Sequence, residues 1–323
     1  MSCVPQTRIR FYDEHPLMAD FFGEVLAGLQ QRPRCISPKF FYGERGSVLF
    51  DAICRTEEYY PTRTEQQLLQ THAAEIAELI GEQCLLIEPG SGNSEKVRLL
   101  LDQLQPAAYL PMDISRDFLF QAAEQVANDY PWLDVHAACV DFTAPLSLPW
   151  CPDNGRRLIF FPGSSIGNFD PGQAEEFLRN LHGVAGEQGS LLIGVDLKKD
   201  PAILNAAYND SDGVTAAFNL NLLHRIQEEL DADIDPESFT HHAFYNTELG
   251  RVEMHLVSQR AQTLKIGEQQ FHFDRDESIH TESSYKYTIE EFTDLAGRAG
   301  FVSRKVWTDP DQLFSLHYFD VGE

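Results

Sequence analysis

Between residues 84 and 197 the sequence alternates strand-like and helix-like segments, and this alternation constrains the fold more than any other feature. The strand-like segments are 84–90, 107–115, 134–142, the start of 157–169, and 189–197, and the helix-like segments are 94–104, 115–130 and 173–185. Strands that alternate with helices in this way build a mostly parallel sheet with helices on both faces. The sequence therefore predicts an α/β fold.

The alternation stops after residue 197. Residues 200–230 are mainly helical in pattern, and 242–266 and 269–287 show the period-2 alternation typical of an antiparallel hairpin. A helix capped at Thr288 and two strands within 302–320 close the chain. We therefore expect one domain made of residues 61–197 and 287–323, and a second α+β lobe made of residues 10–60 and 198–286.

Two further helices are predicted before the alternating region. Residues 17–31 and 64–80 have helical apolar spacing, the second with a cap near Thr62 or Thr64 and a stop at Gly81.

The charge of the chain narrows the classes of partner. Asp and Glu total 50 against 25 Lys and Arg, a formal net charge of -25. Nucleic acid and anionic membranes bind through clustered Lys and Arg, so we expect neither as a partner. A small zwitterionic or neutral substrate is compatible with this charge.

The start of the sequence has no signal-peptide pattern, and no apolar run reaches the length of a membrane span. The six cysteines are scattered without a CxxC pair, which indicates free thiols in a reducing compartment. We expect a cytoplasmic protein that works as a monomer. No His/Cys spacing fits zinc, and His241 and His242 point to opposite faces of a strand, so we expect no metal.

The first strand of the alternating region leads into a glycine loop, in the stretch "IEPGSGNSEKVRLL" (87–100). A dinucleotide loop needs a third glycine, and here Glu95 stands in its place. The spacing of a phosphate-binding Walker loop is absent as well. The loop therefore predicts a ligand without a pyrophosphate.

Acidic side chains follow consecutive strands of the predicted sheet. Glu88 precedes the glycine loop, Asp113 ends the next strand, and Asp141 and Phe142 end the third. Open α/β sheets bind ligands at these carboxyl ends, where an acid can accept ribose hydroxyls and an aromatic ring can cover a base. This set predicts S-adenosylmethionine (SAM) as the cofactor. Its amino-carboxylate tail would lie against Gly90, Gly92 and Lys96.

The fourth strand is followed by "FPGSSIGNF" (161–169). The Asn/Asp-Pro-Pro-aromatic motif of adenine and glutamine amino-methyltransferases is missing from this place. Gly163, Gly167 and Asn168 instead offer backbone groups and an amide that can grip a small polar ligand.

Long segments resemble the histidine-specific SAM-dependent methyltransferases: "SPKFFYGERGSVLFDAICRTEEYYPTRTE" (37–65), "EPGSGNSEK", "FPGSSIGNF", 196–226, "RVEMHL" (251–256) and "TESSYKY" (281–287). The resemblance spans about residues 37–320. It implies a Rossmann-like class I SAM methyltransferase sheet with a second, substrate-binding lobe. It also implies trimethylation of the α-amino group of L-histidine to hercynine, the first step of ergothioneine biosynthesis.

The resemblance further implies the site residues. The SAM set matches Glu88, Gly90, Gly92, Lys96, Asp113, Asp141 and Phe142, and the substrate set is Tyr42, Phe50, Tyr59, Gly163, Asn168, Tyr208, Met254, Glu282 and Ser284. Tyr42, Tyr59 and Asn168 are the expected catalytic residues. Our own hypothesis is that the amine enters neutral, or becomes neutral with help from Tyr42 or water. Asn168 and Tyr208 would hold the α-carboxylate through neutral donors.

Glu282 and Ser284 lie two apart on one predicted strand and therefore share a face. Glu282 can accept an imidazole N–H, and Ser284 can give or take a hydrogen bond. Ser283 between them should point away. Three other functions remain possible from the sequence: a methyltransferase for another amine such as tryptophan, a non-catalytic SAM- or amino-acid-binding protein, and an NAD oxidoreductase.

Overall fold

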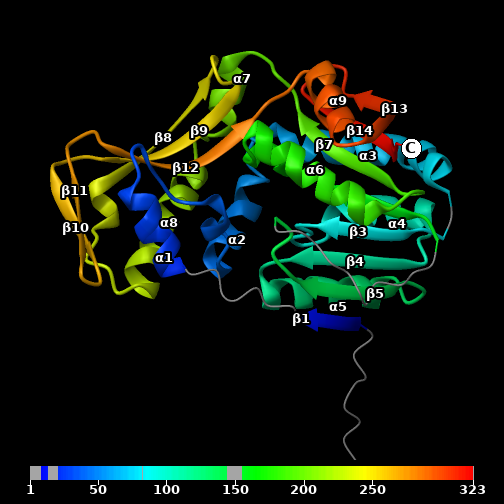
Figure 1. Ribbon diagram of the computed structural model, residues 1–323, viewed down its shortest axis with the longest axis horizontal. Coiled ribbons are helices and arrows are strands. Elements are labelled where there is room, and N and C mark those ends of the chain that lie inside the picture. The colour runs from blue at the N-terminus through cyan, green and yellow to red at the C-terminus, as the bar shows by residue number, and fades with distance from the viewer. Residues whose placement is uncertain (1–8, 14–20, 82, 144–154, 323) are drawn as a thin grey trace, which may run out of the picture.

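The computed structural model describes residues 9–13, 21–81, 83–143 and 155–322, and it contains the predicted parallel sheet (Figure 1). Among these residues eight strands form the main sheet in the order β1-β5-β4-β3-β6-β7-β14-β13. Their bounds are β1 Ile9–Asp13, β3 Leu85–Pro89, β4 Ala108–Asp113, β5 Asp134–Cys139, β6 Arg157–Phe161, β7 Ser190–Asp196, β13 Phe301–Thr308 and β14 Phe314–Val321. Neighbouring strands are parallel from β1 to β7, and β14 runs antiparallel to β7 and β13.

Helices cover both faces of this sheet, as the alternation predicts. One apolar core joins the sheet to α3 (Tyr60–Ile80), α4 (Glu95–Leu104) and α5 (Arg116–Asp129). A second core joins its other face to α6 (Pro171–Ala185) and α9 (Ile289–Arg298). The central strands are buried along their whole length, which explains their continuous apolar runs. Among the described helices, none is long and apolar enough to cross a membrane.

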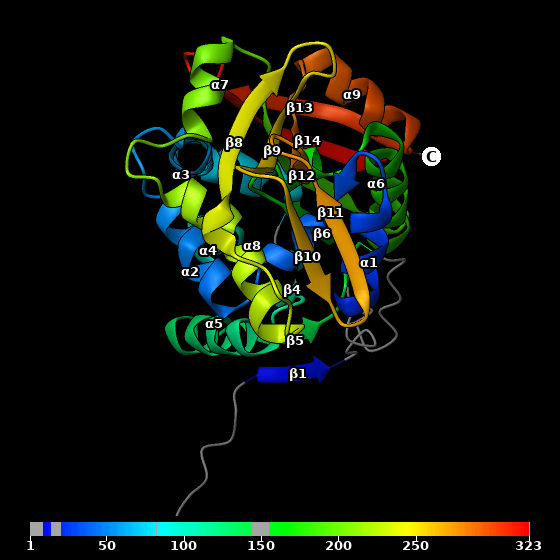
Figure 2. The same ribbon diagram turned by 90° about the vertical axis from the view of Figure 1, so that its left-hand side faces the viewer.

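A second, smaller sheet lies beside the first (Figures 1 and 2). Its strands, in order, are β2 (Arg34–Cys35), β12 (Ser278–Tyr285), β9 (Arg251–Ser258) and β8 (Phe239–Asn246). A separate hairpin, β10 (Gln262–Ile266) and β11 (Gln269–Phe273), stands at the far end of this lobe (Figure 1). The helical elements that belong to the same core are α1 Phe21–Gln30, η1 Pro38–Phe41, α2 Glu44–Ile53, α7 Pro201–Ala207 and α8 Val214–Glu229. Two short turns, η2 Ser165–Asn168 and η3 Pro236–Ser238, complete the fold.

Several predicted elements differ from the structure in their bounds. The helical stretch 200–230 is broken into α7 and α8, because Asp210 accepts the backbone N–H groups of Val214 and Thr215 and starts a new helix there. The single hairpin predicted over 242–287 is wrong: it is two hairpins, and β12 then returns to pair with β9.

The ends of the helices agree with the sequence predictions at some positions and differ at others. Helix α3 begins at Tyr60 with Pro61 in its first turn, so the predicted caps at Thr62 or Thr64 are wrong. Gly81 ends that helix as predicted, and the capping box at Thr288 is confirmed. The predicted helix over 17–31 is α1 from Phe21 onward, and residues 17–20 lie outside the described residues.

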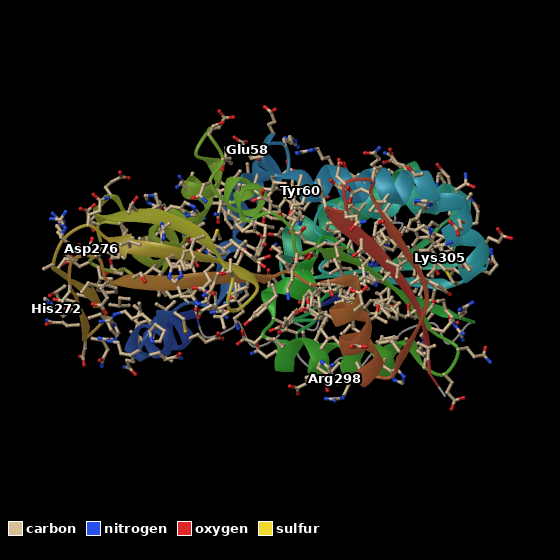
Figure 3. The ribbon with its side chains drawn as sticks, turned by 90° about the horizontal axis from the view of Figure 1, so that it is seen from above. Glu58, Tyr60, His272, Asp276, Arg298 and Lys305 are labelled. Carbon is tan, nitrogen blue, oxygen red and sulfur yellow. The ribbon has the colours of Figure 1, made fainter. Side chains whose placement is uncertain are left out.

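The division into two lobes remains a proposal, and the strand pairing corrects it at one end. Residues 10–13 were assigned to the second lobe, but β1 pairs with β5 at the edge of the main sheet. This pairing joins residues more than 120 positions apart, and no local pattern in the sequence reveals it. Seen from above, Tyr60 lies in the middle of the molecule, with His272 and Asp276 towards one end and Lys305 towards the other (Figure 3).

Candidate active site

The structure gathers the predicted site residues around two adjoining hollows. The inner cavity is lined by all the predicted substrate residues, namely Tyr42, Phe50, Tyr59, Gly163, Asn168, Tyr208, Met254, Glu282 and Ser284. The outer groove is lined by all the predicted SAM residues, namely Glu88, Gly90, Gly92, Lys96, Asp113, Asp141 and Phe142. Six of the substrate residues, Tyr42, Phe50, Tyr59, Gly163, Asn168 and Glu282, also border the groove, so the two hollows meet. The individual roles of these residues remain predictions.

The glycine loop forms one wall of the outer groove. Gly90 and Gly92 have φ angles of +67° and +53°, which favour glycine. A Cβ at Gly90 would lie 3.1 Å from the ring of Phe142, so the glycine lets that ring pack against the loop. The Oγ atom of Ser91 is buried and has no hydrogen-bond partner within the described part of the chain. A ligand with polar atoms at this loop would satisfy it.

Asp113 ends β4 and is fixed by backbone donors. Its carboxylate accepts the N–H of Gly92 at 3.1 Å and the N–H of Ser115 at 2.9 Å. Burial raises its pKa, while these two bonds oppose the rise. The carboxylate is thus held rigidly beside the glycine loop, where a ribose would pass.

Glu88 is the last residue but one of β3 and is almost completely buried. Tyr109 donates a hydrogen bond to its carboxyl group, and burial raises the pKa of Glu88 to about 8. A cation in the groove, such as the ammonium of a SAM tail, would favour the ionised form. The residue fits its predicted place, although Tyr109 was not foreseen as its partner.

Lys96, which is predicted to lie against the cofactor tail, is paired with a carboxylate of the protein. Its Nζ lies 2.6 Å from Oε2 of Glu65, which is fully buried on α3. The backbone N–H of Gly163 also donates to Glu65, at 2.9 Å. Glu65 therefore ties the outer groove to the loop after β6, and the charge of Lys96 is already paired.

Asp141 and Phe142 follow β5. Asp141 accepts the backbone N–H of Thr143 at 3.0 Å, and the ring of Phe142 packs against Phe161 and Phe177 with centroids 6.2 Å apart. One acid and one aromatic face thus border the groove together, as an adenine site requires.

Aromatic rings form one wall of the inner cavity. Phe50 contacts Tyr42 and Tyr59 with ring centroids 5.7 Å and 6.5 Å apart, and Phe218 of α8, which was not predicted, packs against Tyr42 at 5.9 Å. Burial raises the pKa of Tyr42 and of Tyr59 well above the usual value for tyrosine. Both therefore stay neutral phenols, and the prediction that Tyr42 takes the proton of the amine is disfavoured.

Glu282 provides a carboxylate on the opposite wall. It pairs across the sheet with Met254 of β9, and both side chains are buried. Burial raises the pKa of Glu282 to about 7, while the charge of Lys286 opposes the rise. Among the described residues no group donates a hydrogen bond to this carboxylate, so it is available to a ligand.

Ser284 and Tyr208 lie deeper in the cavity. Tyr208 donates to Oγ of Ser284 at 2.8 Å, and Nζ of Lys286 lies 2.8 Å from the same Oγ and 3.2 Å from the hydroxyl of Tyr208. An ammonium, which was not predicted from the sequence, thus lies directly behind both hydroxyls, and the role of Tyr208 as a neutral donor to the α-carboxylate stays a prediction. Ser283 bonds to His280 at 3.2 Å instead of lining the inner cavity, as its predicted orientation requires.

The ammonium of Lys286 is held by Asp196, the last residue of β7. Asp196 pairs with Lys286 at 2.8 Å and Lys199 at 2.6 Å, and it accepts a hydrogen bond from Tyr60 at 2.7 Å. Burial raises the pKa of Asp196, but the two lysines together outweigh this and keep it below its usual value. The sequence contained a signal for both missed residues. Asp196 is another strand-end acid, and Lys286 continues the alternation of Glu282 and Ser284.

One other group has a metal-like composition. Ligand atoms of Glu253, His255 and His280 lie within 4.8 Å of one another on the second sheet. The rings of His255 and His280 are stacked 4.9 Å apart, so their in-plane lone pairs do not converge on one point. Arg251 also pairs with Glu253 at 2.9 Å and brings a positive charge there. We therefore assign this group to hydrogen bonding within the sheet.

Comparison with known proteins places this architecture in a family. The sequence profile of a family described as histidine-specific, SAM-dependent methyltransferases matches residues 21–321. This chain belongs to that family. Its fold is accordingly the class I SAM methyltransferase fold, and SAM is its co-substrate.

Curated relatives of this methyltransferase differ in the acceptor that their names give. A histidine N-alpha-methyltransferase from Mycolicibacterium smegmatis is 41% identical over 91% of this chain and 92% of its own length. Ergothioneine biosynthesis protein 1 of Neurospora crassa is 35% identical over 88% of this chain and 33% of its own length. A 4-dimethylallyltryptophan N-methyltransferase of Aspergillus fumigatus is 30% identical over 89% of this chain and 90% of its own length.

The outer groove is the expected SAM site, and Asp113 provides a test of that expectation. Asp113→Ala should weaken the binding of S-adenosylhomocysteine about ten- to a hundredfold, because a hydrogen bond to a charged group contributes roughly 1.5–3 kcal/mol. Calorimetric titration measures this. Asp102→Ala, which removes an exposed acid of α4, is the matched control and should bind normally. An Asp113→Ala protein that binds as tightly as the control would contradict this placement of the ribose.

Proposed function

We propose that this methyltransferase transfers three methyl groups from SAM to the α-nitrogen of L-histidine and so makes hercynine, the first step of ergothioneine biosynthesis. The observation that carries the proposal is the buried, unpartnered carboxylate of Glu282, which faces the cavity beside Ser284. Two polar groups on one wall suit the two nitrogens of an imidazole ring. The mycolicibacterial and Neurospora relatives support the same acceptor and pathway.

The join between the two hollows suits methyl transfer. When bound, SAM supplies a methyl group made electrophilic by its sulfonium. The residues common to both hollows, which include Tyr59, Gly163 and Asn168, would orient the α-nitrogen towards that methyl group. The side-chain amide of Asn168 has no partner among the described residues and is free to receive the α-carboxylate.

The neutral tyrosines of the cavity would then orient the amine without ionising. We propose that histidine reacts with its amine already neutral, and that Tyr42 and Tyr59 direct the lone pair through their hydroxyl groups. The ammonium formed by the first transfer and that formed by the second each release one proton to water before the next transfer, so the lone pair is restored each time. The aromatic faces of both tyrosines would also accept the cationic trimethylated product. The increasing number of methyl groups needs an apolar wall of this kind.

An indole-bearing acceptor is the second candidate, because the name of one relative gives a tryptophan derivative as its substrate. An indole has one N–H and no basic ring nitrogen, so it would leave either Glu282 or Ser284 without a partner. The polar wall of the cavity therefore favours imidazole over indole. A non-catalytic binding protein would hold both ligands without turnover.

The proposal is tested by supplying histidine as the only acceptor and following both products in time. We expect three molecules of S-adenosylhomocysteine to form for each histidine consumed, with hercynine as the final product by mass. Formation of S-adenosylhomocysteine that does not depend on histidine would contradict the proposal, and so would binding of both ligands with no turnover.

We also propose that the enzyme acts as a monomer in the cytoplasm. The described cysteines, Cys35, Cys54, Cys84 and Cys139, carry free thiols, as in proteins of reducing compartments. Cys3 and Cys151 lie outside the described residues.

A further inference from the structure

Lys286 determines which hydrogen bonds the hydroxyls of the inner cavity can make. An ammonium only donates, so each oxygen that it touches must use a lone pair to accept. Lys286 touches Oγ of Ser284 at 2.8 Å and the hydroxyl oxygen of Tyr208 at 3.2 Å. Both hydroxyls are thereby turned so that their protons point away from the ammonium.

The remaining hydrogen bond between the two hydroxyls completes the pattern. Tyr208 donates its proton to Oγ of Ser284 at 2.8 Å. Ser284 therefore accepts from both Tyr208 and Lys286, and its two lone pairs are filled. Its own proton has no acceptor within the described part of the chain, and the hydroxyl borders the inner cavity.

We infer that Lys286 makes Ser284 an obligate donor, so that the cavity accepts only the neutral imidazole ring of histidine, in one tautomer. Glu282 accepts the ring N–H, and Ser284 donates to the bare ring nitrogen. An imidazolium carries N–H on both nitrogens and would place one of them against the proton of Ser284. This inference rests on the proposed function, because it takes histidine as the acceptor.

The ammonium is well placed for this role. Lys286 is buried, and burial lowers its pKa, but Asp196 and Tyr208 together outweigh this and keep the pKa above the usual value. It therefore stays charged throughout the range in which histidine titrates. The titratable groups around the cluster come from five parts of the chain: Tyr42, Tyr59 and Tyr60 from the N-terminal segments, Asp196 and Lys199 at and after the end of β7, Tyr208 after α7, Tyr245 on β8, and Glu282 on β12.

The test compares histidine with 2-fluorohistidine, whose ring stays neutral in weak acid. Both ligands are titrated into the protein saturated with S-adenosylhomocysteine, and the ratio of their affinities is followed from about pH 5 to about pH 8. The wild-type ratio should rise at least about tenfold in favour of histidine, because its ring loses a proton near pH 6.5. Ionisation of Glu282 affects both ligands alike and cancels in the ratio.

Lys286→Met removes the ammonium and returns a lone pair to Ser284. Asp196 keeps its bonds to Lys199 and Tyr60, so the fold should survive. In this variant the affinity ratio should change less than about threefold over the same pH range, since Ser284 can then also accept from an imidazolium. Lys265→Met, on the exposed hairpin strand β10, is the matched control and should behave as wild type.

Three results would overturn the inference. A wild-type ratio that falls as pH rises would mean that Ser284 accepts from the ring and that the cation is preferred. A ratio that does not depend on pH would mean that the ring charge is not read. A Lys286→Met variant with the wild-type profile would remove the role of the ammonium. If histidine does not bind at all, the proposed function itself fails, and that outcome is recognised before any pH profile is recorded.

Discussion

Replacing Glu282 with Ala is expected to lower kcat/KM for histidine roughly a hundredfold, because a hydrogen bond to a charged group contributes about 1.5–3 kcal/mol and the ring N–H loses its only acceptor. The carboxylate is buried and no described residue donates to it, so nothing in the cavity can replace it. The affinity for S-adenosylhomocysteine should change less than about twofold, because Glu282 borders the outer groove but is not one of the predicted SAM contacts.

Ionisation of Glu282 should make histidine binding depend on pH. Burial raises the pKa of Glu282 to about 7. The ionised carboxylate only accepts hydrogen bonds, whereas the protonated form also carries an O–H donor, so the ionised form is the better acceptor for the ring N–H. Histidine affinity should therefore increase as pH rises through about 7, and Glu282→Gln should remove that part of the dependence. Steady-state kinetics at several pH values measures it.

Ser283→Ala serves as the matched control for Glu282→Ala. Ser283 is the next residue on β12, but its hydroxyl bonds to His280 on the other face of the sheet. Its removal should leave kcat/KM for histidine at saturating SAM unchanged within about twofold, because Ser283 borders the outer groove but does not line the inner cavity. An equal loss in both variants would point to a general disturbance of β12 and would contradict recognition by Glu282.

Replacing Asp196 with Ala is expected to destabilise the folded protein by about 3–5 kcal/mol, the usual cost of removing one partner from a buried ion pair. Asp196 is 1% exposed and holds the ammonium groups of Lys286 and Lys199. Without it, two buried positive charges repel each other and lose the ion-pair partner that they share. Denaturant unfolding at neutral pH measures the loss.

The loss caused by Asp196→Ala should become smaller at alkaline pH. Burial already lowers the pKa of Lys199 to about 8 although Asp196 opposes this, and removal of Asp196 lowers it further. A lysine whose folded pKa is lowered destabilises the fold while it is charged, and this penalty decreases as pH rises from the folded pKa towards the unfolded one. Unfolding at about pH 9 should therefore show a smaller difference from wild type than at about pH 7.

Two further variants test whether the loss of stability in Asp196→Ala comes from the unpaired buried charges. Asp294→Ala removes an exposed acid of α9 and should change stability by less than about 0.5 kcal/mol. The double replacement Asp196→Ala with Lys286→Met should recover part of the stability, because it removes a buried charge together with its partner. A simple sum of the two single losses would contradict the charge argument.

Sequence pattern predicted the parts of the site that follow from strand ends. Asp113 and Asp141 were found because parallel strands bring their carboxyl ends to one edge of a sheet. The same logic applied to β7 leads to Asp196, whose importance appears only when its distant partners are known. Sequence spacing can show that an acid stands at a strand end. It cannot show which buried lysine will pair with it.

Other parts could not be predicted, because they depend on tertiary contacts. The sequence places Lys96 beside a ligand but does not reveal its ion pair with Glu65, which lies 31 positions earlier on a helix that only the fold brings beside it. On β12 the predicted alternation of Glu282 and Ser284 holds, yet a bulge between His280 and Glu282 shifts its phase, and His280 therefore faces the other side. A strict period of two would have placed all three on one face.

The most direct test of the account is one reaction with SAM and an equimolar mixture of histidine and tryptophan, analysed by fragment mass spectrometry. The account predicts that histidine gains up to three methyl groups, all on the α-nitrogen, while tryptophan stays unchanged. Methylation of tryptophan with histidine left intact would contradict it, and so would any methyl group found on the imidazole ring.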